Sequence, residues 1–207
     1  MASVTPFRAL RYTASAGDIA ALTCPPYDIV SETQRKVFLA RNPYNMIRLE
    51  LPREGEDVYA AAGQTLADWL SAGVLKTAEK PAFYLDAMDF SVGGRAYSVA
   101  GVIGEAALSP FSDGVILPHE ETLSKAKEDR FQLMKATDCN FSTIYSLYSD
   151  GESKLNIAAF AETAPLWWDM TAGDGVRHRL WAIEDKADCA RISAHFADKK
   201  LYIADGH

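Results

Sequence analysis

The stretch FYLDAMDFSVGGRAYSVAGVIGE, residues 83–105, decides the fold class of this chain. Residues 83–92 and 95–105 are both rich in the β-branched, aromatic and other apolar residues that favour strands. Gly93-Gly94 lies between them, and a tight hairpin favours such a pair because both turn positions need a positive φ. The stretch therefore predicts an antiparallel β-hairpin.

The sequence around this hairpin predicts a second hairpin and several single helices. Ser31 and Gln34 match a capping box, which predicts a helix that runs to Arg41 and is stopped by Asn42-Pro43. The other expected elements are an extended segment at 1–30, a strand at 46–51, a helix at 56–72 ended by Gly73, a loop at 110–118, a helix at 120–136, a strand at 141–148, a helix at 154–162, a hairpin of strands 166–171 and 176–183, a helix at 186–197 and a strand at 200–204. We therefore expect an α+β fold with a mixed or mostly antiparallel sheet, hairpins and flanking helices.

Composition and charge limit the class of protein. The chain has 207 residues, enough to bury a sizeable core, and we expect 1–207 to form a single α+β unit with one weak candidate boundary near Asp150-Gly151. No apolar run approaches the roughly 20 residues that cross a bilayer, and no signal peptide is apparent, so we expect a cytoplasmic protein. Its three widely spaced cysteines are expected to be reduced thiols rather than metal ligands. A net charge of −7 argues against a broad nucleic-acid-binding face.

The last strand delivers Asp205-Gly206-His207 at its carboxyl end. A glycine directly after a strand lets the backbone approach a ligand, and its N–H can point at a phosphate. Asp205 and His207 could supply a base, a metal ligand or a hydrogen-bond donor. The alternative is a simple terminal turn or a cloning scar.

A second segment joins acidic and basic residues at residues 119–130. His119, Glu120 and Thr122 lead into the expected helix, on which Glu120 and Lys127 would share a face with Arg130 at its edge. Asp129 would be turned away from that group, nearer Thr122. Such a helix could aim a carboxylate, an ammonium and a guanidinium at an anionic ligand. The alternative is a solvated helix with i,i+4 ion pairs such as Glu121 with Lys125.

A third segment is Cys24-Pro-Pro-Tyr27-Asp28, in which two prolines would present Tyr27 and Asp28 at a fixed angle. A structural turn capped by Asp28 is the alternative, and Cys24 is expected to be inert because no activating residue is adjacent. We expect His178 to be a satisfied core histidine and His195 to lie on a surface helix.

Together these segments resemble the family called domain of unknown function 1015. The resemblance rests on residues 6–11, 25–31 and 42–43, on Pro118-His119-Glu120 with Thr122, on Lys127-Glu-Asp-Arg130 with Asn140, and on Asp205-Gly206-His207, in the family's order. Members are about twice this long, so the resemblance implies that the chain is the N-terminal part of a longer protein. It also implies that the terminal loop continues with a second histidine and an arginine.

That loop is in turn similar to the phosphate-binding loop of ParB/sulfiredoxin-like proteins, which include a free serine kinase. This similarity implies that His207 would touch phosphate, Glu120 would be the general base, and Lys127 or Arg130 would balance charge. The expected catalytic residues are Glu120, His119 and Asp129. The expected phosphate- or ligand-binding residues are Asp205, Gly206, His207, Lys127, Arg130, Thr122, Tyr27, Asp28 and Asn140.

Two functions fit these residues. The first is a nucleotide- or phosphate-dependent enzyme that phosphorylates a small metabolite, with ADP or ATP and Mg²⁺ as the implied cofactor. The second is a non-catalytic ligand-sensing or protein-interaction module that uses the charged helix for docking. DNA binding is disfavoured by the net charge, and the sequence leaves the oligomeric state open.

Overall fold

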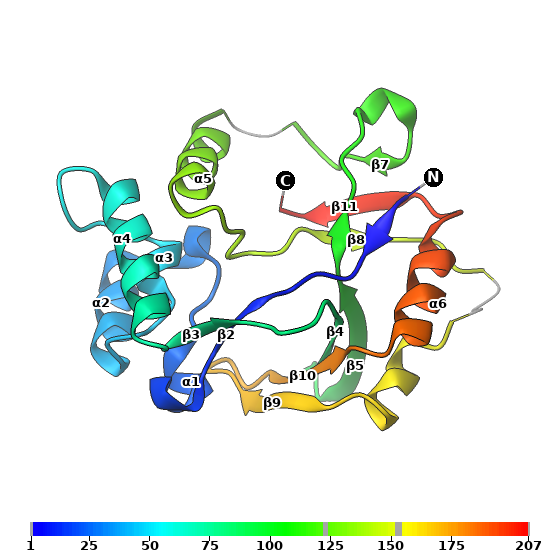
Figure 1. Cartoon of the computed structure of the whole chain (residues 1–207), viewed down its shortest axis with the longest axis horizontal. Coiled ribbons are helices and arrows are strands. Elements are labelled where there is room, and N and C mark those ends of the chain that lie inside the picture. The colour runs from blue at the N-terminus through cyan, green and yellow to red at the C-terminus, as the bar shows by residue number, and fades with distance from the viewer. Residues whose placement is uncertain (1, 122–123, 152–154, 207) are drawn as a thin grey trace. The chain divides into compact units, whose positions relative to one another are not determined.

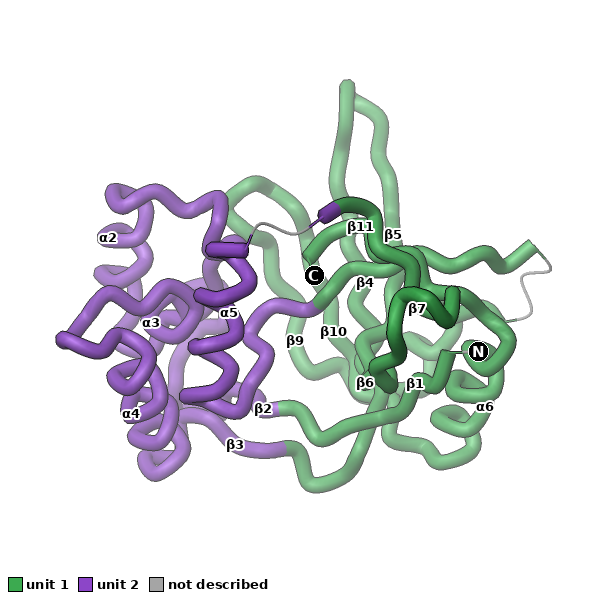
Figure 2. Tube along the Cα trace, turned by 90° about the horizontal axis from the view of Figure 1, so that it is seen from above, with its two compact units in different colours: residues 1–9, 78–120, 144–206 green, residues 10–77, 121–143, 207 purple. Residues whose placement is uncertain are grey.

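The computed structural model of the chain describes residues 2–121, 124–151 and 155–206. The chain divides into two compact units, and each is built from segments that are far apart in sequence (Figure 2). Unit 1 contains the chain up to Ala9, Ala78–Glu120 and Ile144–Gly206, and unit 2 contains Leu10–Thr77 and Glu121–Thr143. The described residues form helices and mostly antiparallel sheets joined by loops (Figure 1), so the α+β class expected from the sequence is confirmed.

Unit 1 holds a four-stranded antiparallel sheet in the order β5-β4-β10-β9 and a three-stranded sheet in the order β7-β11-β8. A short pair of strands, β1 with β6, completes the pairing described there. The elements of unit 1 are β1 (Val4–Thr5), β4 (Phe83–Val92), β5 (Arg95–Ile103), β6 (Glu105–Ala106), η3 (Phe111–Asp113), β7 (Ile116–Leu117), β8 (Tyr145–Leu147), η4 (Ile157–Glu162), β9 (Leu166–Thr171), β10 (Arg177–Ile183), α6 (Lys186–Phe196) and β11 (Leu201–Asp205).

Both predicted hairpins form. Strands β4 and β5 pair from Val92 with Arg95 down to Tyr84 with Ile103. Gly93 and Gly94 take φ of 58° and 78°, as the two-residue turn requires. Strand β10 pairs with β9 on one side and with β4 on the other, which joins the two hairpins into one sheet.

The core of unit 1 lies between this sheet and helix α6. Asp185 caps α6 by accepting the N–H groups of Ala187 and Asp188, and the helix then buries Ile192 and Phe196. They pack in one cluster with buried strand residues that include Phe83, which is fully buried. Burial of side chains of this size stabilises the fold by about 1.5–3 kcal/mol each.

Unit 2 is mainly helical, with one two-stranded sheet of β2 and β3. Its elements are β2 (Leu10–Tyr12), η1 (Ala14–Ala16), α1 (Ile19–Leu22), η2 (Tyr27–Ile29), α2 (Glu32–Arg41), α3 (Ile47–Glu50), α4 (Val58–Ser71), β3 (Leu75–Thr77) and α5 (Ser124–Thr137). The described part of the chain up to Val30 contains only short elements, as its prolines predict, but the expectation of an extended segment is wrong where η1, α1 and η2 form helical turns.

Helix α2 begins and ends where the sequence predicts, and helix α4 covers Val58–Ser71 of the helix expected at 56–72. Ser31 Oγ accepts the Gln34 N–H at 3.3 Å, and Gln34 Oε1 accepts the Ser31 N–H at 2.9 Å. These two bonds complete the capping box. Helix α4 starts after Asp57, and Gly73 follows its end with a φ of 69°, the conformation that favours glycine after a helix. Its buried face, with Leu66 and Trp69, forms the main core of unit 2.

The predicted strand at 46–51 is wrong, because this segment contains helix α3. The cause is Asn45, which is fully buried and donates its side-chain amide to the carbonyls of Ala21 and Thr23 at 2.8 and 3.1 Å. Its side-chain oxygen accepts the Ile47 N–H at 3.0 Å, which favours the first helical turn over an extended chain.

Three other boundaries differ from the prediction. Helix α5 begins at Ser124 rather than Glu120, because the chain is still extended at Leu117 in β7, within the predicted loop, and residues 119–120 form a bend. The expected helix at 154–162 is a 3₁₀ helix from Ile157, and its residue 154 lies outside the described residues. Strand β8 covers only Tyr145–Leu147 of the strand expected at 141–148, because its pairing with β11 extends over these residues alone.

Candidate functional site

The three-stranded sheet of unit 1 brings two of the predicted segments to the same end. Strand β11 runs parallel to β7, with Leu201 opposite Ile116 and Tyr202 opposite Leu117. Both strands therefore point their carboxyl ends in the same direction. His119-Glu120, just after β7, and Asp205-Gly206, at the end of β11, lie at this end of the sheet.

The polar groups at this end are accessible to a ligand. His119 Nε2 lies 3.7 Å from Glu120 Oε1, with 32% of the His119 side chain and 59% of the Glu120 side chain exposed. Asp205 is exposed and lies opposite Tyr145 of β8. Gly206 has a φ of 71°, a conformation that side chains with a Cβ rarely adopt. This end of the sheet therefore combines two carboxylates, an imidazole and a glycine backbone.

Unit 2 brings together Tyr27, Asp129 and Arg130. The Arg130 guanidinium donates from Nε and Nη2 to Asp129 Oδ2 at 2.9 and 2.5 Å, and it lies 3.8 Å above the centre of the Tyr27 ring. Asp129 Oδ1 accepts the Tyr59 hydroxyl at 2.9 Å. The expectation that Asp129 turns away from Arg130 is wrong, because the long arginine side chain folds back onto its neighbour.

Sequence reasoning missed Glu50 and Ser142 in this cluster. Glu50 is only 3% exposed, its Oε1 accepts the Ser142 hydroxyl at 2.5 Å, and Arg130 Nη1 lies 3.7 Å from the same oxygen. Arg130 Nη1 also donates to the Glu50 carbonyl oxygen at 2.9 Å. Glu50 lies at the end of α3, the helix that was predicted as a strand, so no helical spacing pointed to it.

The pKa shifts in unit 2 follow from these contacts. Partial burial raises the pKa of Asp129, but the hydrogen bonds from Arg130 and Tyr59 and the charge of Arg130 outweigh it, so the net shift is downward. The hydrogen bond to Asp129 raises the pKa of Tyr59. Burial, and then the charge of Glu50, raises the pKa of Cys24 to about 12, so this thiol stays protonated and is a poor nucleophile.

The remaining predicted residues do not join these two groups. Asp28, Lys127 and Asn140 are exposed in unit 2. The expected helical face shared by Glu120 and Lys127 is wrong, since Glu120 precedes α5. Thr122 and His207 lie outside the described residues.

The structure also corrects the predicted environment of His195. Its side chain is 4% exposed rather than on the surface, because its ring packs edge-on against Tyr148 and Phe196 at the end of α6. Its Nε2 lies 3.6 Å from Asp150 Oδ2. His178 is half-buried and lies 3.8 Å from Asp86.

Other features place limits on the site. A shallow groove of about 570 Å³ lies between residues 89–91, 96–98 and 174–176, and no predicted site residue lines it. Within the described parts of the chain, three or more His, Cys, Asp or Glu side chains nowhere gather in a way that could hold a metal ion. In the same parts, none of the helices combines the length and the apolar character needed to span a membrane.

Comparison with known proteins identifies a family but no function. No curated protein and no solved structure shows significant similarity to this chain. The sequence profile described as "Protein of unknown function (DUF1015)" matches residues 4–207, nearly the whole chain. The chain therefore belongs to the DUF1015 family of proteins of unknown function.

Proposed function

We propose that this protein binds a nucleotide, ADP or ATP with Mg²⁺, and transfers a phosphoryl group to a small metabolite. The observation that supports the proposal is the parallel pairing of β7 with β11, which brings His119-Glu120 and Asp205-Gly206 to one end of a sheet. Ligands of α/β proteins commonly bind at the carboxyl ends of parallel strands, where loops present backbone N–H groups and side chains.

Each residue at this end has a chemical task in the proposal. The N–H groups around Gly206 contact a phosphate, because a glycine lets the backbone approach closely. Glu120 accepts the proton of the metabolite hydroxyl. At the same time the hydroxyl oxygen bonds to the transferred phosphorus, and the bond from that phosphorus to the leaving phosphate oxygen breaks. His119, beside Glu120, donates a hydrogen bond to a phosphate oxygen or to the metabolite.

The predicted basic residues differ in their surroundings. Arg130 is occupied by Asp129, Glu50 and Tyr27, so we assign it to the stability of unit 2. Lys127 is exposed on α5 of unit 2, and the role that the sequence suggests for it, balancing phosphate charge, stays a prediction.

Calorimetric titration of the full-length protein with ADP, ATP and CTP, with and without Mg²⁺, tests the proposal. We expect at least one nucleotide to bind and Gly206→Val to weaken binding, because valine is strained at positive φ. Glu120→Gln should keep binding and slow phosphoryl transfer by about 10²–10⁴-fold. Asp113→Asn, at an exposed carboxylate of the same unit, is the matched control. Failure of every nucleotide to bind under both conditions would refute the proposal.

One observation favours the alternative of a protein-interaction module. Helix α5 exposes 58% of Phe131 and 44% of Met134, and Lys127 lies on the same exposed face. In that case Phe131→Ser would abolish capture of a partner protein, and nucleotides would not bind.

A further inference from the structure

Strand β5 forms an open edge of the four-stranded sheet in unit 1. Within the described residues β5 pairs only with β4, over its whole length Arg95–Ile103 and without a register shift. Every second residue of such an edge strand points its backbone N–H and C=O groups away from the sheet. In the described parts of the chain, these outward groups form no backbone hydrogen bond with another segment. They are therefore available to a further strand.

The outward groups belong to the even-numbered residues of β5. Gly93-Gly94 make a two-residue turn, so the two residues that flank it form the first hydrogen-bonded pair with β4. Of the even-numbered residues, Ala96, Ser98 and Ala100 are exposed. Residues 96–103 include no lysine, proline or acidic residue, although edge strands commonly use such residues to prevent pairing with another chain. The edge is therefore suited to pairing.

Asp86 on β4 is a carboxylate beside this edge with an unsatisfied oxygen. Its Oδ1 is buried and accepts no hydrogen bond from the described residues, and His178 Nδ1 lies 3.8 Å away. Burial raises the pKa of Asp86, against the opposite effect of His178. Gly101 of β5 lies directly opposite Asp86, and no described side chain comes within 4 Å of the position that its Cβ would take. Because 25% of the Asp86 side chain is exposed, a cation that crosses Gly101 can contact the carboxylate.

Strand β5 itself carries a suitable cation in Arg95. Arg95 and Gly101 are an even number of residues apart, so they share a face of the sheet. The guanidinium carbon lies 5.5 Å from the centre of the Tyr97 ring on that face. If two copies paired antiparallel with Ser98 opposite Ser98, Arg95 of one copy would lie opposite Gly101 of the other. Two strand spacings, about 10 Å, would then separate its Cα from that of Asp86, a distance that the two side chains together span.

We propose that two copies of this chain pair antiparallel through β5, with Ser98 on the two-fold axis and Arg95 of each copy bound to Asp86 of the other. Such an interface is self-complementary, as a two-fold dimer requires. The outward even-numbered residues then form the hydrogen-bonded pairs. Tyr97 lies opposite Val99 of the second copy, and pairs of an aromatic with a β-branched residue stabilise a sheet.

Charge and backbone geometry select this register. A shift by one residue would place outward backbone groups opposite groups that already bond to β4. A shift by two residues would place Arg95 opposite Val99 or Ile103 instead of Gly101, and a side chain would then block its path to Asp86. The inference does not depend on the proposed phosphate site, since no residue of that site takes part.

Sedimentation equilibrium of the full-length protein over a wide range of concentration tests the proposal, and we expect a monomer–dimer equilibrium. Arg95→Gln and Asp86→Asn should each raise the dissociation constant of the dimer about tenfold or more. The double variant should raise it no further, because either single change already breaks the contact. The control is Arg177→Gln, at an exposed arginine of β10 that pairs with Asp169, and it should leave the dimer unchanged.

Ser98→Pro tests the backbone pairing separately. It removes the outward N–H at the two-fold axis and no bond to β4, so it should abolish the dimer. If circular dichroism shows that this variant has lost its sheet, the Arg95 and Asp86 variants decide alone.

Three results would overturn the proposal. The first is a protein that stays monomeric at every concentration. The second is a dimer that Arg95→Gln, Asp86→Asn and a folded Ser98→Pro all leave unchanged, which would place the interface on another face. The third is additivity of Arg95→Gln and Asp86→Asn, because independent effects would show that the two side chains do not meet.

Discussion

Asp129 uses both carboxylate oxygens in contacts within unit 2. Oδ2 accepts two N–H groups of Arg130, and Oδ1 accepts the Tyr59 hydroxyl. Charge-assisted bonds of this kind favour the ionised form, and they account for the lowered pKa of Asp129 despite its partial burial. An ionised, fully bonded carboxylate is better suited to orienting Arg130 over Tyr27 than to accepting a proton at neutral pH.

We predict that Asp129→Asn lowers the free energy of unfolding by about 1–2 kcal/mol at neutral pH. Because the folded pKa lies below the unfolded value, the stabilisation is complete above the unfolded pKa and is lost as pH falls through the folded pKa. Urea unfolding at pH 7 and pH 3 checks this prediction. The difference in the free energy of unfolding between Asp129→Asn and the unchanged chain should be smaller at pH 3 than at pH 7. The control is Glu128→Gln, at an exposed neighbour on α5. An equal loss of unfolding free energy by Asp129→Asn at both pH values would contradict a stabilising role for the ionised carboxylate.

Sequence reasoning reached some of these residues and not others. Residue type and spacing pointed to Tyr27, Asp129 and Arg130 and also fitted a solvated helix, and the family resemblance then added support for them. Glu50 was not found, because a single glutamate gains its meaning only when Ser142 and Arg130, 92 and 80 residues away, fold against it. Long-range contacts of this kind leave no local pattern.

At the scale of elements, local signals predict well where they agree with the tertiary structure. The hairpin of β4 and β5 has strand-forming residues and a turn of two glycines with positive φ, all between residues 83 and 105. Helix α3 is different, because its first turn depends on the Asn45 side chain and on backbone carbonyls of the α1 region. The same reasoning explains β7, a two-residue strand defined only by its pairing with β11.

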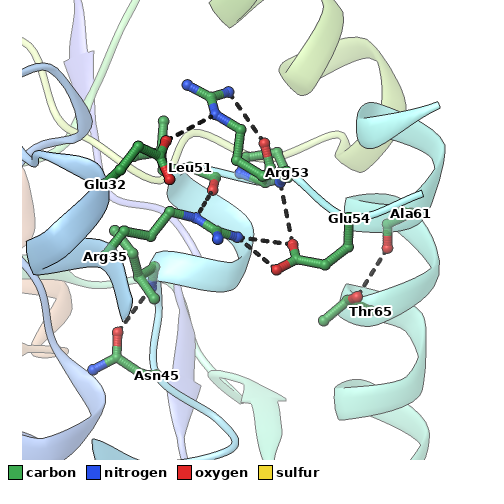
Figure 3. Close-up of polar contacts among 10 residues, drawn as sticks. Glu32, Arg35, Asn45, Leu51, Arg53, Glu54, Ala61 and Thr65 are labelled. Carbon is green, nitrogen blue, oxygen red and sulfur yellow. Dashed lines mark hydrogen bonds and ion pairs between the residues drawn. The ribbon is translucent and has the colours of Figure 1, made fainter. Parts of the chain in front are cut away.

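Arg35 links helix α2 to the segment between α3 and α4 (Figure 3). Its side chain is 6% exposed; Nε donates to the Leu51 carbonyl at 2.8 Å, and Nη2 contacts both Glu54 oxygens at 2.7 and 2.8 Å. Glu54 is 54% exposed, so solvent screens the ion pair, and much of the stabilisation comes from the planar guanidinium bridging two acceptors.

We predict that Arg35→Lys lowers the free energy of unfolding by about 2 kcal/mol, because an ammonium cannot satisfy both acceptors in the fixed geometry of a guanidinium. The matched control is Arg53→Lys, since Arg53 is 49% exposed and lies 3.6 Å from Glu32. That change should cost less than about 0.5 kcal/mol. Thermal denaturation compares the two variants. Equal losses of unfolding free energy would show that burial of the Arg35 guanidinium contributes little to stability.

At the scale of the whole molecule, the chain passes between the two units several times. Unit 2 takes its residues from both sides of Ala78–Glu120, and no glycine-, proline- or serine-rich linker marks the crossings. A search for linkers therefore has no signal to detect. Each of the two largest hydrophobic clusters nevertheless draws its buried residues from one unit: Leu66 and Trp69 belong to a cluster of unit 2, and Ile192 and Trp181 to a cluster of unit 1.

Because the clusters are separate, we predict that a cavity in one core weakens that unit first. Leu66→Ala should cost about 2–5 kcal/mol and should speed amide exchange in α4 and α5, while the amides of β4 and β10 keep their protection. Ile192→Ala is the reciprocal variant, and it should speed exchange in α6 and in the four-stranded sheet. Unfolding unit 2 would leave unit 1 with longer closed loops, and each doubling of loop length costs only about 0.6 kcal/mol. Hydrogen exchange followed by mass spectrometry measures both variants peptide by peptide. Equal acceleration in both units by either variant would show that the chain unfolds as one cooperative body, and the separate clusters would then have no separate stability.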